Sequence, residues 1–373
     1  MNTCKSRLEN LVLVSFLSMI LISCGGNGEE PEQPDISDIP SFTAQEIFSI
    51  SDVEDVYFAH LGYESVVLEN GNIAFADRNI PNITIINKEG ELQKVIREGR
   101  GPGEVLDAYE FSKDSEGIIY TYDQDNDKLL VFENDFEIRK EIIPPNYEMT
   151  SLVKAYPTEL EGKLIFELTS FEFLRNEDKQ RENILIQYDS ETESYGEERV
   201  LKAQPYARLI VDGQPRGASL IPYSYGNLTA YNAKDKTMFT FDTGTNLIAE
   251  IDADFDTLKT IPVNLPTEEI SSAELDSMEA AYDDLRWNTL KNVLPEVKAP
   301  VDKMIYQNGE FWMESNILGE TEMWLVLNLE GQITRVVHLP KESMLMHVSD
   351  EHLGVRLDDV TFALFKNPKL EVL

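Results

Sequence analysis

A short acidic run is the part of this sequence that most resembles a site for chemistry. Asp123-Gln124-Asp125-Asn126-Asp127 places carboxylates at positions 1, 3 and 5, as a calcium-binding loop does. Such a loop also needs a glycine at position 6 and a glutamate at position 12, where this chain has Lys128 and Asn134. A hairpin turn between two strands therefore explains the run better. No cofactor is predicted, although a calcium ion held weakly elsewhere is compatible with so acidic a chain.

Charged residues at the ends of apolar runs form a second candidate site. Asp77-Arg78 and Asp123 end equivalent runs in neighbouring repeat units, and Arg100 stands in a glycine-rich loop between them. If the units surround an axis, these side chains could face the mouth of a central channel. We therefore take Asp77, Arg78, Arg100 and Asp123 as candidate ligand-binding residues. Turn capping and ion pairs between units are the simpler alternative.

Signatures of common enzymes are missing from the sequence. The histidines do not pair at zinc spacing such as HExxH, and there is neither a GxSxG elbow nor a GxxxxGK[ST] loop. No catalytic residue is predicted, and a non-catalytic binding or scaffold module for a protein or glycan partner is the preferred function. The alternative is a metal-dependent hydrolase or lyase with its site in the channel. The four histidines are His60, His338, His347 and His352.

Aromatic residues could supply a stacking platform for a sugar. Tryptophan in a ring of packed sheets more often fills the core between the sheets, so the platform is the less favoured interpretation. The residues concerned are Tyr223, Tyr225, Trp287, Trp312 and Trp324.

Repeated strand pairs must position all of these side chains. Six times a glycine, or a polar residue in its place, precedes a short apolar run, and a second apolar run follows it. The first three starts are 46 and 45 residues apart, and a period of roughly 40–50 residues with hairpin turns is typical of a propeller blade. The sequence thus predicts an all-β, six-bladed β-propeller over residues 41–373. The six starts are Gly71, Gly117, Gly162, Lys236, Gly309 and Glu351.

A resemblance to a known family accompanies this repeat. The loop Gly99-Arg100-Gly101-Pro102-Gly103-Glu104, followed by a strand pair with Asp123 before its hairpin, resembles the six-bladed β-propeller lipoproteins of Bacteroidetes. That family is related to NHL-repeat and TolB-like propellers. The resemblance covers about residues 45–373, and it implies a six-bladed propeller in a lipoprotein.

The amino terminus predicts export and lipid anchoring. Residues 1–23 have a positive start, a short apolar stretch and the ending Leu21-Ile22-Ser23 before Cys24, which resembles a lipoprotein signal peptide. Cys24 would carry acyl chains such as palmitate and anchor the protein to the outer membrane, on its periplasmic or its outer side. Residues 24–40 are rich in Gly, Pro and acid, which predicts a disordered tether.

Three segments depart from the repeat. Residues 46–57 should donate the strand that closes the ring, because the last unit lacks one. An insertion at about 204–222 carries two Arg and three Pro. A second insertion, at about 268–296, is helical: Ser271 and Glu274 make a capping box, and Leu275, Met278, Tyr282 and Leu285 follow at helical spacing. We expect one helix over about 272–294, on one face of the propeller.

Charge excludes one class of partner. The formal net charge is −36, with 68 acidic and 32 basic residues, which argues against nucleic acid and against direct contact with anionic lipid headgroups. Contact with the membrane is therefore predicted only through the lipid anchor.

Overall fold

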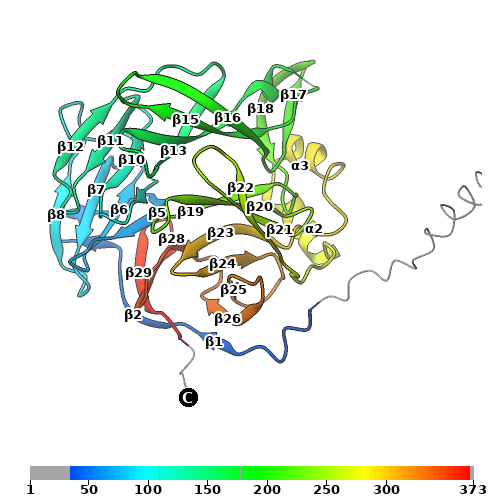
Figure 1. Cartoon of the computed structure of the whole chain (residues 1–373). Coiled ribbons are helices and arrows are strands. Elements are labelled where there is room, and N and C mark those ends of the chain that lie inside the picture. The colour runs from blue at the N-terminus through cyan, green and yellow to red at the C-terminus, as the bar shows by residue number, and fades with distance from the viewer. Residues whose placement is uncertain (1–33, 109, 177, 370–373) are drawn as a thin grey trace, which may run out of the picture. The chain divides into compact units, whose positions relative to one another are not determined.

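Six antiparallel sheets form a ring, and each is one blade of a β-propeller (Figure 1). The computed structural model describes residues 34–108, 110–176 and 178–369, and the propeller occupies a unit that begins at Asp35. The predicted signal peptide, Cys24 and the tether up to residue 33 lie outside the described residues. The predicted fold class, a six-bladed propeller with one helical insertion, is confirmed.

Blades 1 to 4 each take their strands from one stretch of chain. Blade 1 contains β5 (Leu61–Val67), β6 (Ile73–Asp77), β7 (Asn82–Ile86) and β8 (Leu92–Ile96). Blade 2 contains β9 (Ser112–Lys113), β10 (Ile119–Asp123), β11 (Lys128–Phe132) and β12 (Ile138–Ile142). Blade 3 contains β13 (Thr150–Pro157), β14 (Lys163–Ser170), β15 (Glu182–Asp189) and β16 (Ser194–Lys202), with a 3-10 turn η1 (Glu172–Leu174). Blade 4 contains β19 (Asn227–Asn232), β20 (Thr237–Asp242), β21 (Leu247–Ile251) and β22 (Thr257–Pro262).

Blades 5 and 6 each borrow a strand from the amino-terminal segment. Blade 5 contains β23 (Val301–Gln307), β24 (Glu310–Ser315), β25 (Glu322–Leu327) and β26 (Ile333–Leu339), with β1 (Ser41–Thr43) parallel to β26. Blade 6 contains β27 (Met344–Val348), β28 (His352–Asp358) and β29 (Thr361–Lys366), with β2 (Gln45–Ile50) antiparallel to β29.

The borrowed strand β2 closes the ring as predicted, but it is shorter than the predicted 46–57. The residues after it form a separate small hairpin, β3 (Asp52–Val53) and β4 (Val56–Tyr57), because Glu54 adopts a positive φ of 53° and turns the chain back. The compact unit that contains the propeller begins at Asp35, earlier than the predicted residue 41. Ile36 and Ile39 pack against the core of blades 4 and 5, and the Val336 amide donates to the Pro40 carbonyl at 2.9 Å.

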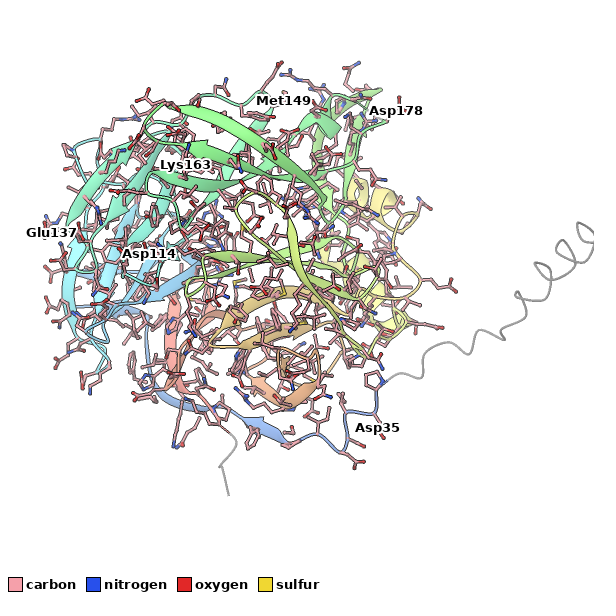
Figure 2. All side chains as sticks on the ribbon, in the orientation of Figure 1. Asp35, Asp114, Glu137, Met149, Lys163 and Asp178 are labelled. Carbon is pink, nitrogen blue, oxygen red and sulfur yellow. The ribbon has the colours of Figure 1, made fainter. Side chains whose placement is uncertain are left out.

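Burial explains why two runs of each unit are apolar. The second and third strands of a blade are covered on both faces by the neighbouring blades, and every residue of β6 and β7 is buried. The outer strand faces solvent on one side, and β12 is exposed over most of its length. The labelled side chain of Glu137, just before β12, lies at the rim of the ring (Figure 2). Lys236, which replaces the usual glycine, adopts the positive φ of 54° that the hairpin turn requires.

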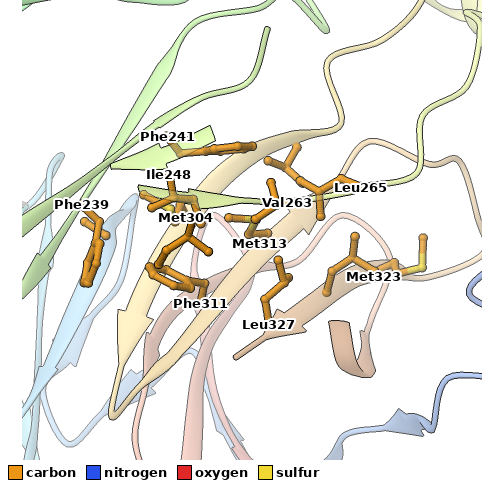
Figure 3. Packing of buried hydrophobic residues seen from close by; sticks show 14 of the residues in the cluster. Phe239, Phe241, Ile248, Val263, Leu265, Met304, Phe311, Met313, Met323 and Leu327 are labelled. Carbon is orange, nitrogen blue, oxygen red and sulfur yellow. The ribbon is translucent and has the colours of Figure 1, made fainter. Parts of the chain in front are cut away.

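Apolar side chains from adjacent blades interlock and hold the blades together. In the cluster between blades 4 and 5, Phe239 and Phe241 face Met304 and Phe311 (Figure 3). Fully burying such a side chain contributes roughly 1.5–3 kcal/mol, so the ring is stable although one blade alone would not be.

The two insertions lie on the same face of the ring, because both connect the outer strand of one blade to the inner strand of the next. The first is a hairpin, β17 (Tyr206–Val211) and β18 (Gln214–Leu220). The second contains two helices, α2 (Ser272–Ala281) and α3 (Asp284–Leu290), so the expectation of one helix over 272–294 was wrong. The capping box of Ser271 and Glu274 is confirmed.

The helix breaks for a local reason. Tyr282 and Asp283 are both extended, with ψ of 149° and 160°, and the Asp283 side chain accepts a hydrogen bond from the Arg286 amide and caps α3. The predicted apolar stripe ends at the break, since Leu285 is exposed. None of the helices in the described residues is long and apolar enough to cross a membrane.

Candidate functional site

The central channel holds a cavity of about 820 Å³. All six blades contribute to its wall through their inner strands β5, β9, β13, β19, β23 and β27. It extends from Glu64 and Lys154 outward past the ends of these strands to Lys234, Asn308 and His352. The cavity therefore opens on the face where inner strands end.

An ion cluster from three blades forms the floor of this cavity. The ammonium of Lys154 contacts a carboxylate oxygen of Glu64 and lies 3.8 Å from a carboxylate oxygen of Glu110. Glu64 also accepts a hydrogen bond from the Phe111 amide at 3.1 Å. These three charged side chains are only 19–20% exposed, so their attraction is little screened by solvent. Blades 1, 2 and 3 are thereby joined at the axis.

The excess of carboxylate over ammonium in this cluster shifts its titration. Burial, together with the neighbouring charge of Glu64, raises the pKa of Glu110 to about 7, although Lys154 works against the shift. Burial opposes the charge of Lys154, but Glu64 and Glu110 outweigh it and raise its pKa above the ordinary value. The floor therefore combines a permanent cation, a carboxylate and a group that exchanges a proton near neutral pH.

A second lysine lies across the axis. The ammonium of Lys303 on β23 donates to the carbonyl oxygens of Leu345 at 2.8 Å and Tyr63 at 3.3 Å, which tie blade 5 to blades 6 and 1. Burial lowers its pKa. Glu314 stands opposite Lys303 on β24, and burial raises the pKa of Glu314 to about 7.

Hydroxyl groups continue the polar surface above the floor. Glu167 on β14 accepts hydrogen bonds from the Tyr156 hydroxyl at 2.9 Å and from the Thr229 hydroxyl at 3.0 Å. The Tyr156 and Thr229 side chains line the cavity, so Glu167 fixes their orientation from behind. The cavity therefore presents hydrogen-bond donors and acceptors in fixed positions.

A serine and a histidine also meet at the cavity wall. The Ser65 hydroxyl lies 2.5 Å from Nδ1 of His347, and both residues are 7% exposed. Burial lowers the pKa of His347 to about 3, which makes its imidazole a weak base. Nε2 of His347 has no hydrogen-bond partner among the described residues, so no carboxylate orients the ring as a catalytic triad requires. The pair joins blade 6 to blade 1.

The carboxylates of Glu64 and Glu110 in the channel lie beside the ammonium of Lys154. Within residues 34–108, 110–176 and 178–369, no three His, Cys, Asp or Glu side chains are placed to hold a metal ion. The acidic run at 123–127 is the turn between β10 and β11, where Asp123 pairs with Lys128. The preference for a hairpin over a calcium loop is confirmed there, and calcium elsewhere stays a prediction.

Two of the predicted ligand-binding residues cap backbone turns. Asp77 is 2% exposed and accepts hydrogen bonds from the amides of Ala59, His60, Asn79 and Ile80. Asp123 is fully buried and accepts from the amides of Leu106 and Asp107 at 2.9 Å in the equivalent place of blade 2. Each carboxylate thus fixes the connection that enters its own blade.

The other two predicted residues join the same network. Arg78 donates to the Tyr63 hydroxyl at 3.0 Å and lies 3.9 Å from the carboxylate of Asp107. Arg100 reaches the side-chain oxygen of Asn126 at 3.4 Å, and Asn126 in turn donates to Asp123. The structure therefore brings the candidates of blades 1 and 2 together, on the face where inner strands begin. None of the four lines the central cavity, and their role in binding stays a prediction.

The glycine-rich loop folds around one carboxylate. Glu104 accepts a hydrogen bond from the Gly101 amide at 2.7 Å. A β-carbon at Gly99 would lie 1.9 Å from the Glu104 carboxylate, so a side chain there would displace that carboxylate from the loop. The loop connects β8 to β9, as its position in the repeat predicts.

Two of the aromatic candidates belong to the core between blades. Trp312 and Trp324 are fully buried in the cluster between blades 5 and 6, which excludes them from stacking on a sugar. The hydroxyl of Tyr225 donates to the Val297 and Lys298 carbonyls. Sequence reasoning missed the channel residues, because it followed the most apolar runs. A usable signal was a charged residue inside a short strand, as at Glu64, Lys154 and Lys303.

Comparisons with known proteins concern the fold. No family model matches the chain, and no curated protein matches its sequence. Among solved structures, a protein of Bacteroides fragilis described as a candidate exported protein is 14% identical, with a TM-score of 0.47; the match covers 88% of this chain and 99% of that one. A DUF4221 member from Bacteroides vulgatus is 11% identical, with a TM-score of 0.48, over 87% and 97%. Virginiamycin B lyase from Staphylococcus aureus is 10% identical, with a TM-score of 0.43, over 86% and 99%.

Proposed function

We propose that this protein is a lipid-anchored binding module of the outer membrane whose central cavity takes a small glycan. The cavity supports this proposal, because all six blades build it and its wall contains charged and hydroxyl-bearing residues beside apolar ones. Its volume of about 820 Å³ lies in the range of roughly 300–1,000 Å³ that is usual for small-molecule sites. A folded protein partner could not enter it and would have to use another face.

The chemistry of the floor suits a ligand rich in hydroxyl groups. A sugar hydroxyl both donates and accepts, and the floor offers the carboxylate acceptor of Glu64 beside the donor of Lys154. Tyr156 and Thr229 add fixed hydroxyls to the wall. A ligand with a strong net charge would leave one partner of the ion cluster unpaired, which is costly at this burial.

The test is a glycan screen with the full mature chain, followed by a variant of the floor. Lys154→Met combined with Glu64→Gln removes one positive and one negative charge together, and the third member of the cluster, Glu110, already has a pKa raised to about 7 by burial. We expect binding of the best glycan to weaken at least tenfold in this double variant, as measured by calorimetry. The matched control is Lys163→Met, because Lys163 pairs with Asp189 on the outer part of blade 3. Binding that survives the double variant, or a screen in which only proteins are captured, would contradict the proposal.

Anchoring rests on Cys24, which lies outside the described residues. Cys24→Ser should release the protein from the membrane fraction, because an acyl chain contributes about 0.8 kcal/mol per buried CH₂. Mass spectrometry of the mature amino terminus tests this directly. A mature protein without acyl groups would remove the anchor from the proposal and leave the glycan site standing.

A further inference from the structure

The two insertions enclose a second cavity of about 480 Å³. The end of the hairpin insertion supplies one wall, including Leu220 and Tyr223, and the helical insertion supplies the other with Met278, Tyr282 and Arg286. Gln204 and Asp302 close it on the propeller side, where the Gln204 amide donates to Asp302 at 3.0 Å. The insertions also share an apolar contact of Ala207 and Ile221 with Leu290, so the two walls are fixed relative to each other.

This cavity is separate from the central one. Both touch the inner strand β23, but Asp302 near its start lines the second cavity, and Met304 to Gln307 line the first. The two cavities therefore lie toward opposite ends of that strand. A ligand in one makes no direct contact with the other.

Arg286 is the notable residue of the second cavity. Its Nε is buried and has no hydrogen-bond partner among the described residues, and the guanidinium makes no ion pair within them. It lies 5.4 Å from the ring centre of Tyr282. An arginine without a carboxylate partner is unexpected in a chain with 68 acidic and 32 basic residues. Stacking on Tyr282 covers one face of the guanidinium and leaves its N–H edge for a planar anion.

The walls around Arg286 are mostly apolar and are held in place. Tyr223 adopts a positive φ of 57°, which is strained for an aromatic residue. The Lys298 ammonium 4.8 Å from its ring centre and the Ala299 amide bonded to its carbonyl at 2.9 Å keep it there. Such strain persists only where the surroundings impose it, and here it presents the Tyr223 ring to the cavity.

We propose that the cavity between the insertions is a second binding site, for a small organic acid in which one carboxylate is attached to an apolar or aromatic body. Arg286 binds the carboxylate through two parallel hydrogen bonds. Met278, Tyr282 and Tyr223 cover the body of the ligand. Asp302 lines the same cavity and repels additional negative charge, so a monocarboxylate is preferred over a dianion such as phosphate.

Calorimetry with the full mature chain tests the site with three probes. Benzoate carries the carboxylate and the aromatic body, benzamide keeps the shape without the charge, and inorganic phosphate keeps charge without the body. We expect benzoate to bind at least tenfold more tightly than either of the others. Equal binding of benzoate and benzamide, or of benzoate and phosphate, would overturn the proposal.

Variants assign the binding to Arg286. Arg286→Met should weaken benzoate binding at least tenfold, and Arg286→Lys should restore part of it, because lysine keeps the charge but loses the planar pair of donors. Arg216→Met is the control, since Arg216 is an exposed arginine of the hairpin insertion that does not line this cavity. Without ligand, the melting temperature of Arg286→Met should be no lower than that of the wild type, because no ion pair is lost. A lower melting temperature with unchanged benzoate binding would show that Arg286 has only a structural role.

The second site stands independently of the first. Arg286→Met should leave glycan binding in the central cavity unchanged, and the double variant of Glu64 and Lys154 should leave benzoate binding unchanged. A loss of benzoate binding in that double variant would place the acid in the central cavity and overturn the proposal.

Discussion

At the scale of single residues, a buried group of charged side chains attaches the helical insertion to the propeller. Lys298 is 1% exposed, and its ammonium lies 2.5 Å from Glu274 and 2.6 Å from Glu268. Burial works against the charge of Glu274, but hydrogen bonds from Lys298 and Ser271 outweigh it and lower its pKa to about 2. The same glutamate thus completes the capping box of α2 and fixes the helix to the propeller.

Removing this lysine should be costly. Lys298→Met leaves the carboxylates of Glu274 and Glu268 without a cation, and breaking a buried pair in this way costs roughly 3–5 kcal/mol. Urea denaturation at pH 7 measures the loss. The control is Lys291→Met on the exposed end of α3, which should change the free energy of unfolding by less than about 0.5 kcal/mol. A loss below about 1 kcal/mol in Lys298→Met would show that the pair contributes little.

At the scale of elements, the ring is closed by packing between strands that are far apart in sequence. Phe362 on β29 of blade 6 stacks on Phe75 of blade 1, with ring centres 4.7 Å apart. Phe48 from the borrowed strand β2 packs on the same cluster. The chain continues from β2 to β5, so it links blade 6 to blade 1, and β2 also covers the edge of β29 that could otherwise pair with other chains.

The borrowed strand β2, which helps to close the ring between blades 6 and 1, offers a matched pair of variants. Phe48→Ala should lower the free energy of unfolding by about 2 kcal/mol, less than for a fully buried phenylalanine because Phe48 is half-buried. Ile47→Ala on the same strand should cost less than about 0.5 kcal/mol, since Ile47 is 49% exposed. Thermal or urea unfolding distinguishes the two. Equal effects would mean that β2 does not contribute to closure through its buried face.

At the scale of the whole molecule, the channel collects charge from several blades. Glu110 has its pKa raised to about 7 by burial and by Glu64. In the folded protein it therefore keeps a proton that the unfolded chain has already released between about pH 4.5 and 7. Its contribution to stability consequently falls as pH rises through this window. His347 acts in the opposite direction, because its pKa is lowered to about 3 and stability falls as pH drops from 6.5 toward that value.

The difference in the free energy of unfolding between a Glu110 variant and the wild type separates the titration of Glu110 from that of His347. Glu110→Gln keeps the shape and removes the titration, so the variant should gain stability relative to the wild type as pH rises from 5 to 8. Urea denaturation at both values measures the difference. If the difference in the free energy of unfolding between the two proteins is the same at pH 5 and pH 8, Glu110 does not titrate in this range.

Local patterns in the sequence determined the blades. Apolar second and third strands, hairpin glycines and the capping box at Ser271 are each set by neighbours within a few residues, so the fold class and the blade count could be predicted. The donated strand could also be predicted, because the last unit lacked one. Its length could not, since Glu54 ends it through a turn that no composition signal marked.

Only the tertiary structure determined which residues come together at the two cavities. Glu64, Glu110, Lys154 and Lys303 come from four blades, and their charges interact because the ring brings three inner strands and the segment before β9 to one axis. Arg286 faces a cavity because two insertions far apart in the chain pack against each other. Such convergence depends on closure of the whole ring, and a local pattern carries no information about which distant residue will lie opposite.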